Sequence, residues 1–270
     1  SWMDAYYYFL FAPQMTPDAH ATFLKSWVEH GRTLTRMTVE HPEHQGNWVT
    51  MECNGLAHIG CMFPEFTEAE KWREVAYTRL LEELDRQVYA DFMRATDPAV
   101  RNGLEVPGEY HARLKRMYEY DLNAMIPGGY LPPLNDSGLT NVKRYLEEAY
   151  ATWGDPQFLW GATGGAEGEP VEFASIFFPW AGQAVMRSGW ETDARYLMFE
   201  VGPFGLGHQH EDKLGLYLWG WGKPLLTEAG TYSYDRSNWR RFVLDTPSHN
   251  TVMVDGLPQR RRPLRETYLA

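Results

Sequence analysis

The sequence predicts an α+β protein in which a helical first part is followed by an antiparallel β-sheet. The first part carries apolar residues at helical spacing, and the last part alternates short β-prone runs with Gly, Pro or Asp. A Gly-rich stretch without an apolar period, residues 161–170, separates the two textures. Helices followed by strands indicate two parts, so we expect a helical domain at residues 1–165 and a sheet domain at residues 166–270.

The strongest helical pattern follows Thr67 and Glu70, whose spacing is that of a capping box. Apolar residues then recur every four positions, which is typical of an amphipathic helix; they are Trp72, Ala76, Leu80, Leu84 and Val88. Three further helices are expected at residues 48–62, 109–125 and 139–153. Gly154 is the expected C-terminal cap of the last of these helices, because glycine readily adopts the left-handed conformation found there.

The expected strands lie in the second part, where short runs rich in aromatic and β-branched residues are separated by turn residues. These runs are ASIFFPWAG, QAVMRSGW, ARYLMFEVG, KLGLYLWGWG, KPLLTEAG and NTVMVDG. No run in the chain is long and apolar enough to cross a membrane.

Charge and cysteine content narrow the classes of function. The net charge is −11, and the acidic excess lies almost entirely in residues 1–168, so nucleic acid is not an expected partner. A polyanionic sugar is also an awkward partner for this sum, although a cleft can carry its own local field. The two cysteines, Cys53 and Cys61, would lie about 12 Å apart along a helix, which is too far for a disulfide. We therefore expect two free thiols.

The densest polar constellation lies in residues 202–234. His208 and His210 are two positions apart, so on an extended backbone they would point to the same face. Glu228 lies at the end of a later apolar run, and His249 precedes the last predicted strand. His210, Glu228 and His249 form a two-His, one-carboxylate set that is suited to zinc. The alternative is that these residues are hydrogen-bonded surface or core groups, because an isolated His-x-His is common.

Several ordered motifs resemble the heparinase II/III-like polysaccharide lyases. The block GLGHQHEDKL, then LLTEAGTYSY, then SHNTVMVDG is similar to the signature of that family, and GNW, GEYH and PLNDSG match its upstream segments. The resemblance runs from about residue 41 to residue 257. Short motifs that recur in the same order are more specific than any one of them alone.

The resemblance implies roles for the matching residues. Asn47 matches the residue that binds the uronate carboxylate, and Tyr110 and His208 match the catalytic pair. His210, Glu228 and His249 match the ligands of a structural zinc ion, with Glu228 where relatives usually carry Asp. The substrate-binding set that we expect comprises Trp48, Glu52, Tyr234 and Arg241. Trp48 is itself a departure, because many relatives have His directly after the Asn.

The resemblance also implies an incomplete (α/α) toroid followed by an antiparallel β-sandwich, with the active cleft between them and with longer relatives at both ends. It implies β-elimination on an acidic polysaccharide or oligosaccharide that contains 4-linked uronate, either alginate-like or glycosaminoglycan-like, and a periplasmic or secreted protein. Nothing in the sequence decides the oligomeric state.

Two other classes of function stay open at this point. A glycoside hydrolase on a helical toroid needs two opposed carboxylic acids, and Glu52, Glu105 and Asp136 are available. A non-catalytic uronate-binding protein would need no proton-transfer group. Asn47 as a helix N-cap and Tyr110 as a packed aromatic are the structural alternatives to their functional roles.

Overall fold

The computed structural model describes residues 2–44, 46–84, 99, 102–202, 204 and 208–260. The chain forms two compact units, residues 1–117 and 118–270. Helices give way to strands near the predicted stretch at 161–170, because the last helix before the sheet ends at Thr163 and the first strand of the five-stranded sheet begins at Ile176. The predicted Val88, and Gly205 to Gly207 of the GLGHQH motif, lie outside the described residues.

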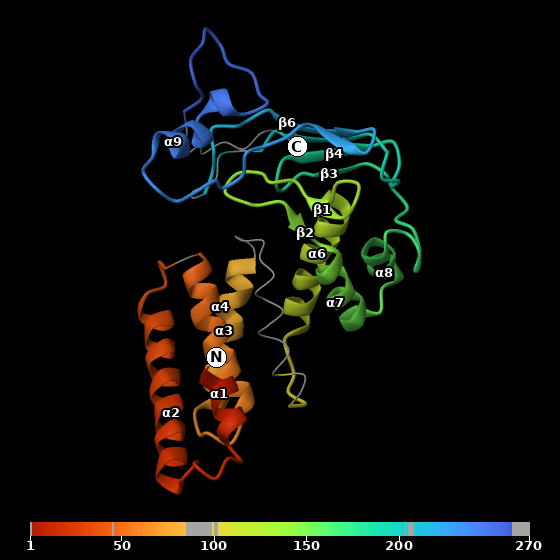
Figure 1. Ribbon diagram of the computed structural model, residues 1–270. Coiled ribbons are helices and arrows are strands. Elements are labelled where there is room, and N and C mark those ends of the chain that lie inside the picture. Colours follow the sequence, from red (N-terminus) through yellow and green to blue (C-terminus); the bar gives the residue numbers. More distant parts are fainter. Residues whose placement is uncertain are drawn as a thin grey trace. The chain divides into compact units, whose positions relative to one another are not determined.

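The first unit is helical (Figure 1). Its helices are α1 (Trp2–Phe9), α2 (Pro17–Glu40), α3 (Asn47–Met62) and α4 (Ala69–Leu84), and α6 (Gly108–Ala124) contains the boundary between the units. The helix predicted at 48–62 is confirmed as α3. The helix predicted after Thr67 begins at Ala69, two residues beyond the expected cap.

The core of this unit forms where α2, α3 and α4 contact one another. Trp27 of α2, Cys53 and Leu56 of α3, and Trp72 and Leu80 of α4 are all buried there. Burial of such apolar side chains is the main stabilising term for helices that are only partly apolar. Cys53 and Cys61 are both free, as predicted, and both are buried.

The second unit begins with the C-terminal part of α6 and a short hairpin. Strands β1 (Tyr130–Leu131) and β2 (Thr140–Asn141) pair antiparallel, and the loop between them carries the PLNDSG motif. Two helices follow, α7 (Lys143–Trp153) and α8 (Pro156–Thr163). Gly154 caps α7 in the left-handed conformation, as predicted.

The strand-rich part is one antiparallel sheet with the order β3-β4-β5-β6-β7. Its strands are β3 (Ile176–Phe178), β4 (Gln183–Arg187), β5 (Tyr196–Glu200), β6 (Gly215–Gly220) and β7 (Lys223–Leu226). Tyr196 and Met198 of β5, Val185 of β4 and Tyr217 of β6 form the core on one face. Their neighbours Leu197 and Met186 point to the other face, which is apolar as well but more exposed.

The last predicted strand, residues 250–256, is not a strand. In the described residues, the carbonyl of Asn250 accepts from the backbone N–H of Leu216 in β6 at 3.1 Å, and Val254 forms an isolated bridge with Leu257. Strand β7 pairs with β6 from Leu218 to Gly220, so this segment meets β6 at Leu216, ahead of that pairing. The chain reaches this segment through helix α9 (Asn238–Leu244) and the 3-10 turn η1 (Thr246–Ser248). No helix in the described part of the chain is long and apolar enough to span a bilayer.

Candidate active site

A buried carboxylate, Asp136, organises the polar cluster of the second unit. It lies in the loop between β1 and β2, and its side chain is only 4% exposed. Its Oδ1 lies 2.8 Å from Nε2 of His210, and its Oδ2 lies 3.1 Å from Nδ1 of His208. The guanidinium of Arg240, from α9, donates to Oδ2 at 2.8 Å. One carboxylate therefore joins the two histidines of the GHQH motif to a helix that follows them by some thirty residues.

Charge and burial act against each other at this carboxylate. Burial raises the pKa of Asp136, but the hydrogen bonds from His210, Arg240 and His208 outweigh it, and the net pKa is lowered. Asp136 is thus held as an anion that accepts from three donors. A carboxyl group in this state is a poor proton donor, which weakens one of the three acids that a hydrolase could use.

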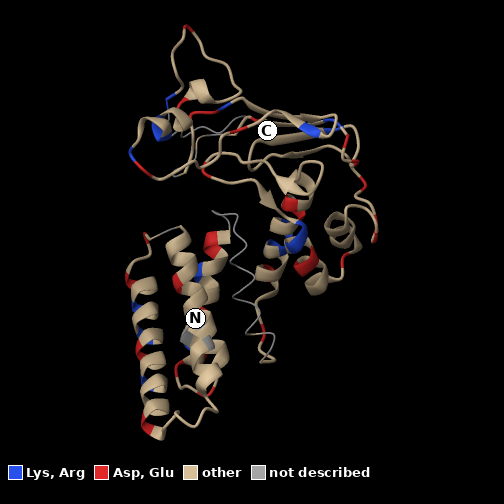
Figure 2. Cartoon of the chain, in the orientation of Figure 1, with Lys and Arg blue, Asp and Glu red and all other residues tan. Residues whose placement is uncertain are grey.

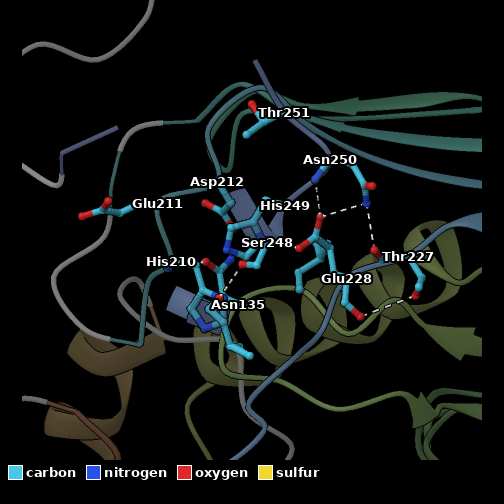
Figure 3. A network of polar contacts seen from close by, with 12 residues as sticks. Asn135, His210, Glu211, Asp212, Thr227, Glu228, Ser248, His249, Asn250 and Thr251 are labelled. Atoms are coloured by element: carbon cyan, nitrogen blue, oxygen red, sulfur yellow. Dashed lines mark hydrogen bonds and ion pairs between the residues drawn. The ribbon is translucent and has the colours of Figure 1, made fainter. Parts of the chain in front are cut away.

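A second buried carboxylate, Glu228, lies beside the imidazole of His249 (Figure 3). A carboxylate oxygen of Glu228 is in close contact with Nδ1 of His249. The other oxygen accepts from the backbone N–H of Asn250 at 3.3 Å and from its side-chain amide at 3.2 Å. Burial lowers the pKa of His249, but Glu228 more than compensates, so the net pKa of this imidazole is raised.

The two buried imidazoles, His210 and His249, face each other with ring centroids 5.2 Å apart. In the described residues, Nδ1 of His210 and Nε2 of His249 are buried nitrogens without a hydrogen-bond partner. Burial also lowers the pKa of His210 and favours its neutral form. Buried imidazole nitrogens without a hydrogen-bond partner, here Nδ1 of His210 and Nε2 of His249, fit the donor set of a zinc ion.

The carboxylate of the predicted ligand set is placed differently from the two imidazoles. Glu228 is engaged by His249 and Asn250. Within the described ranges, one His, Cys, Asp or Glu trio has ligand atoms that all lie within 4.8 Å of one another. It is the exposed trio His41, Glu43 and His44 in the first unit, and not the predicted set. The carboxylate of Glu228 instead contacts His249 directly.

The exposed side of the cluster carries His208 and Tyr234. The side chain of His208 is 60% exposed, and the Tyr234 hydroxyl lies 3.3 Å from its Nδ1, with the two rings in a T-shaped contact. Arg241 is exposed on α9, where basic residues gather (Figure 2). Of the predicted substrate-binding residues, the structure therefore brings Tyr234 into contact with the predicted catalytic histidine.

The remaining predicted residues belong to the first unit. Asn47 is the first residue of α3, with Gly46 as its N-cap, so Asn47 is not the cap itself. Asn47 is exposed, Trp48 is 72% exposed and Glu52 is half-buried. Tyr110, near the start of α6, is 0% exposed and packs edge-to-face against Tyr77.

Sequence reasoning missed the residues that hold the cluster together. From the sequence, PLNDSG was only a match to an upstream family segment, and Asp136 was only a candidate hydrolase acid. Asn135, whose Oδ1 accepts from the backbone N–H of His210 at 2.9 Å, and Arg240 were given no role. The sequence did offer one signal for these contacts. Asn135 and Asp136 lie in the PLNDSG motif, which matches the same family as the GHQH motif.

Comparisons with known proteins show what this chain is similar to. A model described as the heparinase II/III N-terminus matches residues 1–96, and a model described as heparinase II/III-like, C-terminal, matches residues 171–267. The chain belongs to the heparinase II/III-like family. It is 30% identical over 279 residues to a heparin-sulfate lyase of Bacteroides stercoris, covering 92% of this chain and 41% of that protein. It is 26% identical, with the same coverage, to a heparin-sulfate lyase of Pedobacter heparinus.

Solved structures show the same likeness. A heparinase III structure superposes with a TM-score of 0.81 at 28% identity, covering 93% of this chain and 42% of that one. A second heparinase III crystal structure, at 21% identity and a TM-score of 0.80, shows likeness of the fold alone. The chain thus spans about two fifths of the length of the relatives that it matches.

Proposed function

We propose that the protein containing this chain is a polysaccharide lyase that cleaves a 4-linked, uronate-containing glycosaminoglycan by β-elimination. The observation that carries the proposal is the exposed His208 imidazole, fixed by the Asp136 carboxylate and touched by the Tyr234 hydroxyl. The family membership and the heparin-sulfate lyases among its relatives support the substrate class. A periplasmic or secreted location would suit such a substrate and is part of the proposal.

The reaction requires three kinds of group. A base removes the proton on C5 of the uronate, a C4–C5 double bond forms as the bond from C4 to the glycosidic oxygen breaks, and an acid protonates that oxygen. The negative charge that develops on the uronate carboxylate needs a neutral donor. The products are a 4,5-unsaturated uronate and a new hydroxyl on the other sugar.

The residues of this chain are proposed to divide these tasks as the motifs imply. Asn47 donates to the carboxylate through its amide and brings no acidic proton of its own. His208 serves as base or acid, since histidine side chains in general exchange protons near neutral pH. Tyrosine hydroxyls in general are weak acids, so the surroundings of Tyr110 would have to make its hydroxyl more acidic before it serves as a base. That Asn47 and Tyr110 act on the same sugar as His208 rests on the order of the motifs. Tyr110 is completely buried, so the Tyr110→Phe variant, which keeps the ring, tests its hydroxyl.

Zinc is proposed as a structural ion held by His210, Glu228 and His249. The unpartnered buried nitrogens of His210 and His249 support it, and Glu228 supplies the adjacent carboxylate. A bound ion would hold the segment that carries His208, which lies two residues from His210. No proton transfer passes through the ion in this proposal.

For the fold, we propose that the helices belong to an incomplete (α/α) toroid and the sheet to a β-sandwich, with longer sequence around both. The helix-then-sheet order and the antiparallel topology support this. The apolar character of both sheet faces also supports it, because a sheet buried on two faces reads as nearly continuous apolar strands.

The experiment is an assay of the purified protein against heparan-sulfate-type, hyaluronan-type and alginate-type polymers and oligomers. A lyase releases products with the ultraviolet absorbance of a double bond conjugated to a carboxylate. A hydrolase would release reducing ends without that absorbance, and a binding protein would release neither. Either of those outcomes would contradict the proposed function.

A further inference from the structure

We propose that Asp136 is the positioning residue of the site, the group that fixes the orientation and the tautomer of His208 and couples His208 to His210 and Arg240. This inference rests on the proposed function, because it assigns His208 a proton-transfer role. Asp136 itself is not proposed to touch substrate. Its action runs through the imidazole that it holds.

The first support is the number and quality of the contacts to the Asp136 carboxylate. An ionised carboxylate has roughly four acceptor sites, and here both oxygens are used. Oδ1 is paired with Nε2 of His210 at 2.8 Å and with the guanidinium of Arg240 at 2.6 Å. Oδ2 is paired with Nδ1 of His208 at 3.1 Å and with Arg240 at 2.8 Å. Substitution by an uncharged or shorter side chain would leave these donors without their acceptor.

The second support is the backbone around the same contacts. The N–H of Asp136 donates to the carbonyl of His208 at 3.2 Å. The Asn135 side-chain oxygen accepts from the N–H of His210 at 2.9 Å and from the amide of Gln209 at 2.7 Å. Two adjacent residues of one turn thus bind all three residues from 208 to 210.

The third support is backbone strain at the histidine. His208 has a φ of 57°, and Asn135 in the facing turn has a φ of 50°. Residues other than glycine are uncommon in this left-handed region, although Asn and His enter it more readily than most, and contacts with their surroundings help to hold them there. The contacts from Asp136 to both the ring and the carbonyl of His208 supply that restraint.

The tautomers follow from the chemistry of the carboxylate. An ionised carboxylate only accepts, so Nδ1 of His208 carries the proton and Nε2 is left with a free lone pair. The Tyr234 oxygen, 3.3 Å from the same Nδ1, shares that proton. By the same argument His210 is protonated at Nε2, which leaves its buried Nδ1 as a donor for a metal ion. One anion therefore prepares one imidazole for proton transfer and the other for coordination.

Arg240 completes the arrangement. Its side chain is 10% exposed, and it also donates to the carbonyl of Thr231 at 2.7 Å. A buried anion without a cationic partner is costly, so Arg240 keeps Asp136 charged and in place. The role of Arg240 is to hold Asp136, and the role of Asp136 is to hold the imidazoles.

The test compares Asp136→Asn, Asp136→Glu and the control Asp193→Asn, which changes an exposed carboxylate of the loop between β4 and β5 in the same unit. Loss of the orienting carboxylate of a catalytic histidine lowers kcat by up to about 10⁴-fold in a serine protease. We expect Asp136→Asn to lower kcat by about 10²-fold or more with KM changed less than about threefold. Asp136→Glu keeps the charge and should recover part of kcat, and Asp193→Asn should match the wild type.

A second readout does not depend on turnover. The ¹⁵N chemical shifts of the His208 ring distinguish its tautomers, and we expect the Nδ1–H form in the wild type and a mixture in Asp136→Asn. A kcat within about threefold of the wild type in Asp136→Asn would overturn the inference. So would a joint loss of kcat and melting temperature that Asp136→Glu does not relieve, because that marks a structural role alone.

The two readouts also separate this inference from the proposed function. A wild type that forms no unsaturated product from any uronate polymer contradicts the proposed function. The ring shifts then still decide whether Asp136 fixes His208. An unchanged tautomer in Asp136→Asn contradicts the positioning role even in an active enzyme.

Discussion

Replacement of Glu228 by Ala tests the buried pair and the proposed zinc site together. The side chains of Glu228 and His249 are 5% and 0% exposed. The substitution removes the acceptor of the His249 ring and of the Asn250 amide at once. Breaking a buried ion pair by removing one partner costs about 3–5 kcal/mol. For a unit of roughly this size each kcal/mol is worth about 2–4 °C, so the second unit should melt about 6–20 °C lower.

The assay is differential scanning calorimetry with and without a chelator. Calorimetry can record the unfolding of each unit as a transition of its own. A ligand that binds only the folded state stabilises it by about 2.7 kcal/mol at a hundredfold excess over its Kd. The chelator should therefore lower the melting temperature of the wild type and leave that of Glu228→Ala unchanged. Glu172→Ala, which removes an exposed carboxylate ahead of β3, is the matched control and should behave as the wild type.

The outcomes refute different parts of the reasoning. A melting temperature of Glu228→Ala within about 2 °C of the wild type would show that the buried pair contributes little, against the expected cost. If Glu228→Ala is strongly destabilised but the wild type does not respond to the chelator, the result supports the stabilising role of the buried pair and contradicts the proposed zinc ion. Metal analysis of the native protein, before any chelator, checks the second outcome independently.

Three further predictions concern the first unit. Tyr110→Phe keeps the ring packing and removes only the hydroxyl, so kcat on the true substrate should fall by about 10²–10⁴-fold if Tyr110 handles a proton; near-normal turnover would instead mark it as a packed aromatic. Burial raises the pKa of Cys53 to about 12 and also raises the pKa of Cys61. A thiol reagent at neutral pH should therefore label both cysteines only when the protein unfolds. Rapid labelling of the native protein would contradict this prediction. A Cβ at Gly31 would lie 2.7 Å from a buried indole, whereas a Cβ at Gly55 meets nothing closer than 3.6 Å; Gly31→Ala should therefore destabilise by about 1–2 kcal/mol and Gly55→Ala should stabilise by up to about 1 kcal/mol in urea unfolding.

Local signals predicted several helices and strands well, and they failed where a local rule was overlooked. The helix at 48–62 and the Gly154 cap follow directly from apolar spacing and glycine conformation. The longest helix, α2, was not predicted, although Thr16 and Pro17 form a signal for the start of a helix. The Thr16 hydroxyl accepts from the backbone N–H of Ala19 at 3.2 Å, and proline is well suited to the first helical turn.

The contacts of the site could not be read from the sequence, because they join residues far apart in the chain. Asp136 lies 74 positions before His210 and 104 before Arg240. Spacing placed His208 and His210 together, but only the fold brings the turn between β1 and β2 to them. The same limit applies to Glu228. The sequence predicted that it would converge with both imidazoles, and in the structure its carboxylate contacts only the His249 imidazole of the two.

The acidic net charge does not argue against a polyanionic substrate once the partners of the acidic side chains are known. Asp136 is neutralised by Arg240, and Glu228 faces a His249 imidazole whose pKa is raised by that contact. Buried and paired in this way, these carboxylates project little field toward solvent. Arg241 is exposed on the same helix that supplies Arg240. Since a local field, rather than the net charge, governs attraction at a site, these two paired carboxylates do not by themselves oppose the acidic sugar that we propose at the exposed His208.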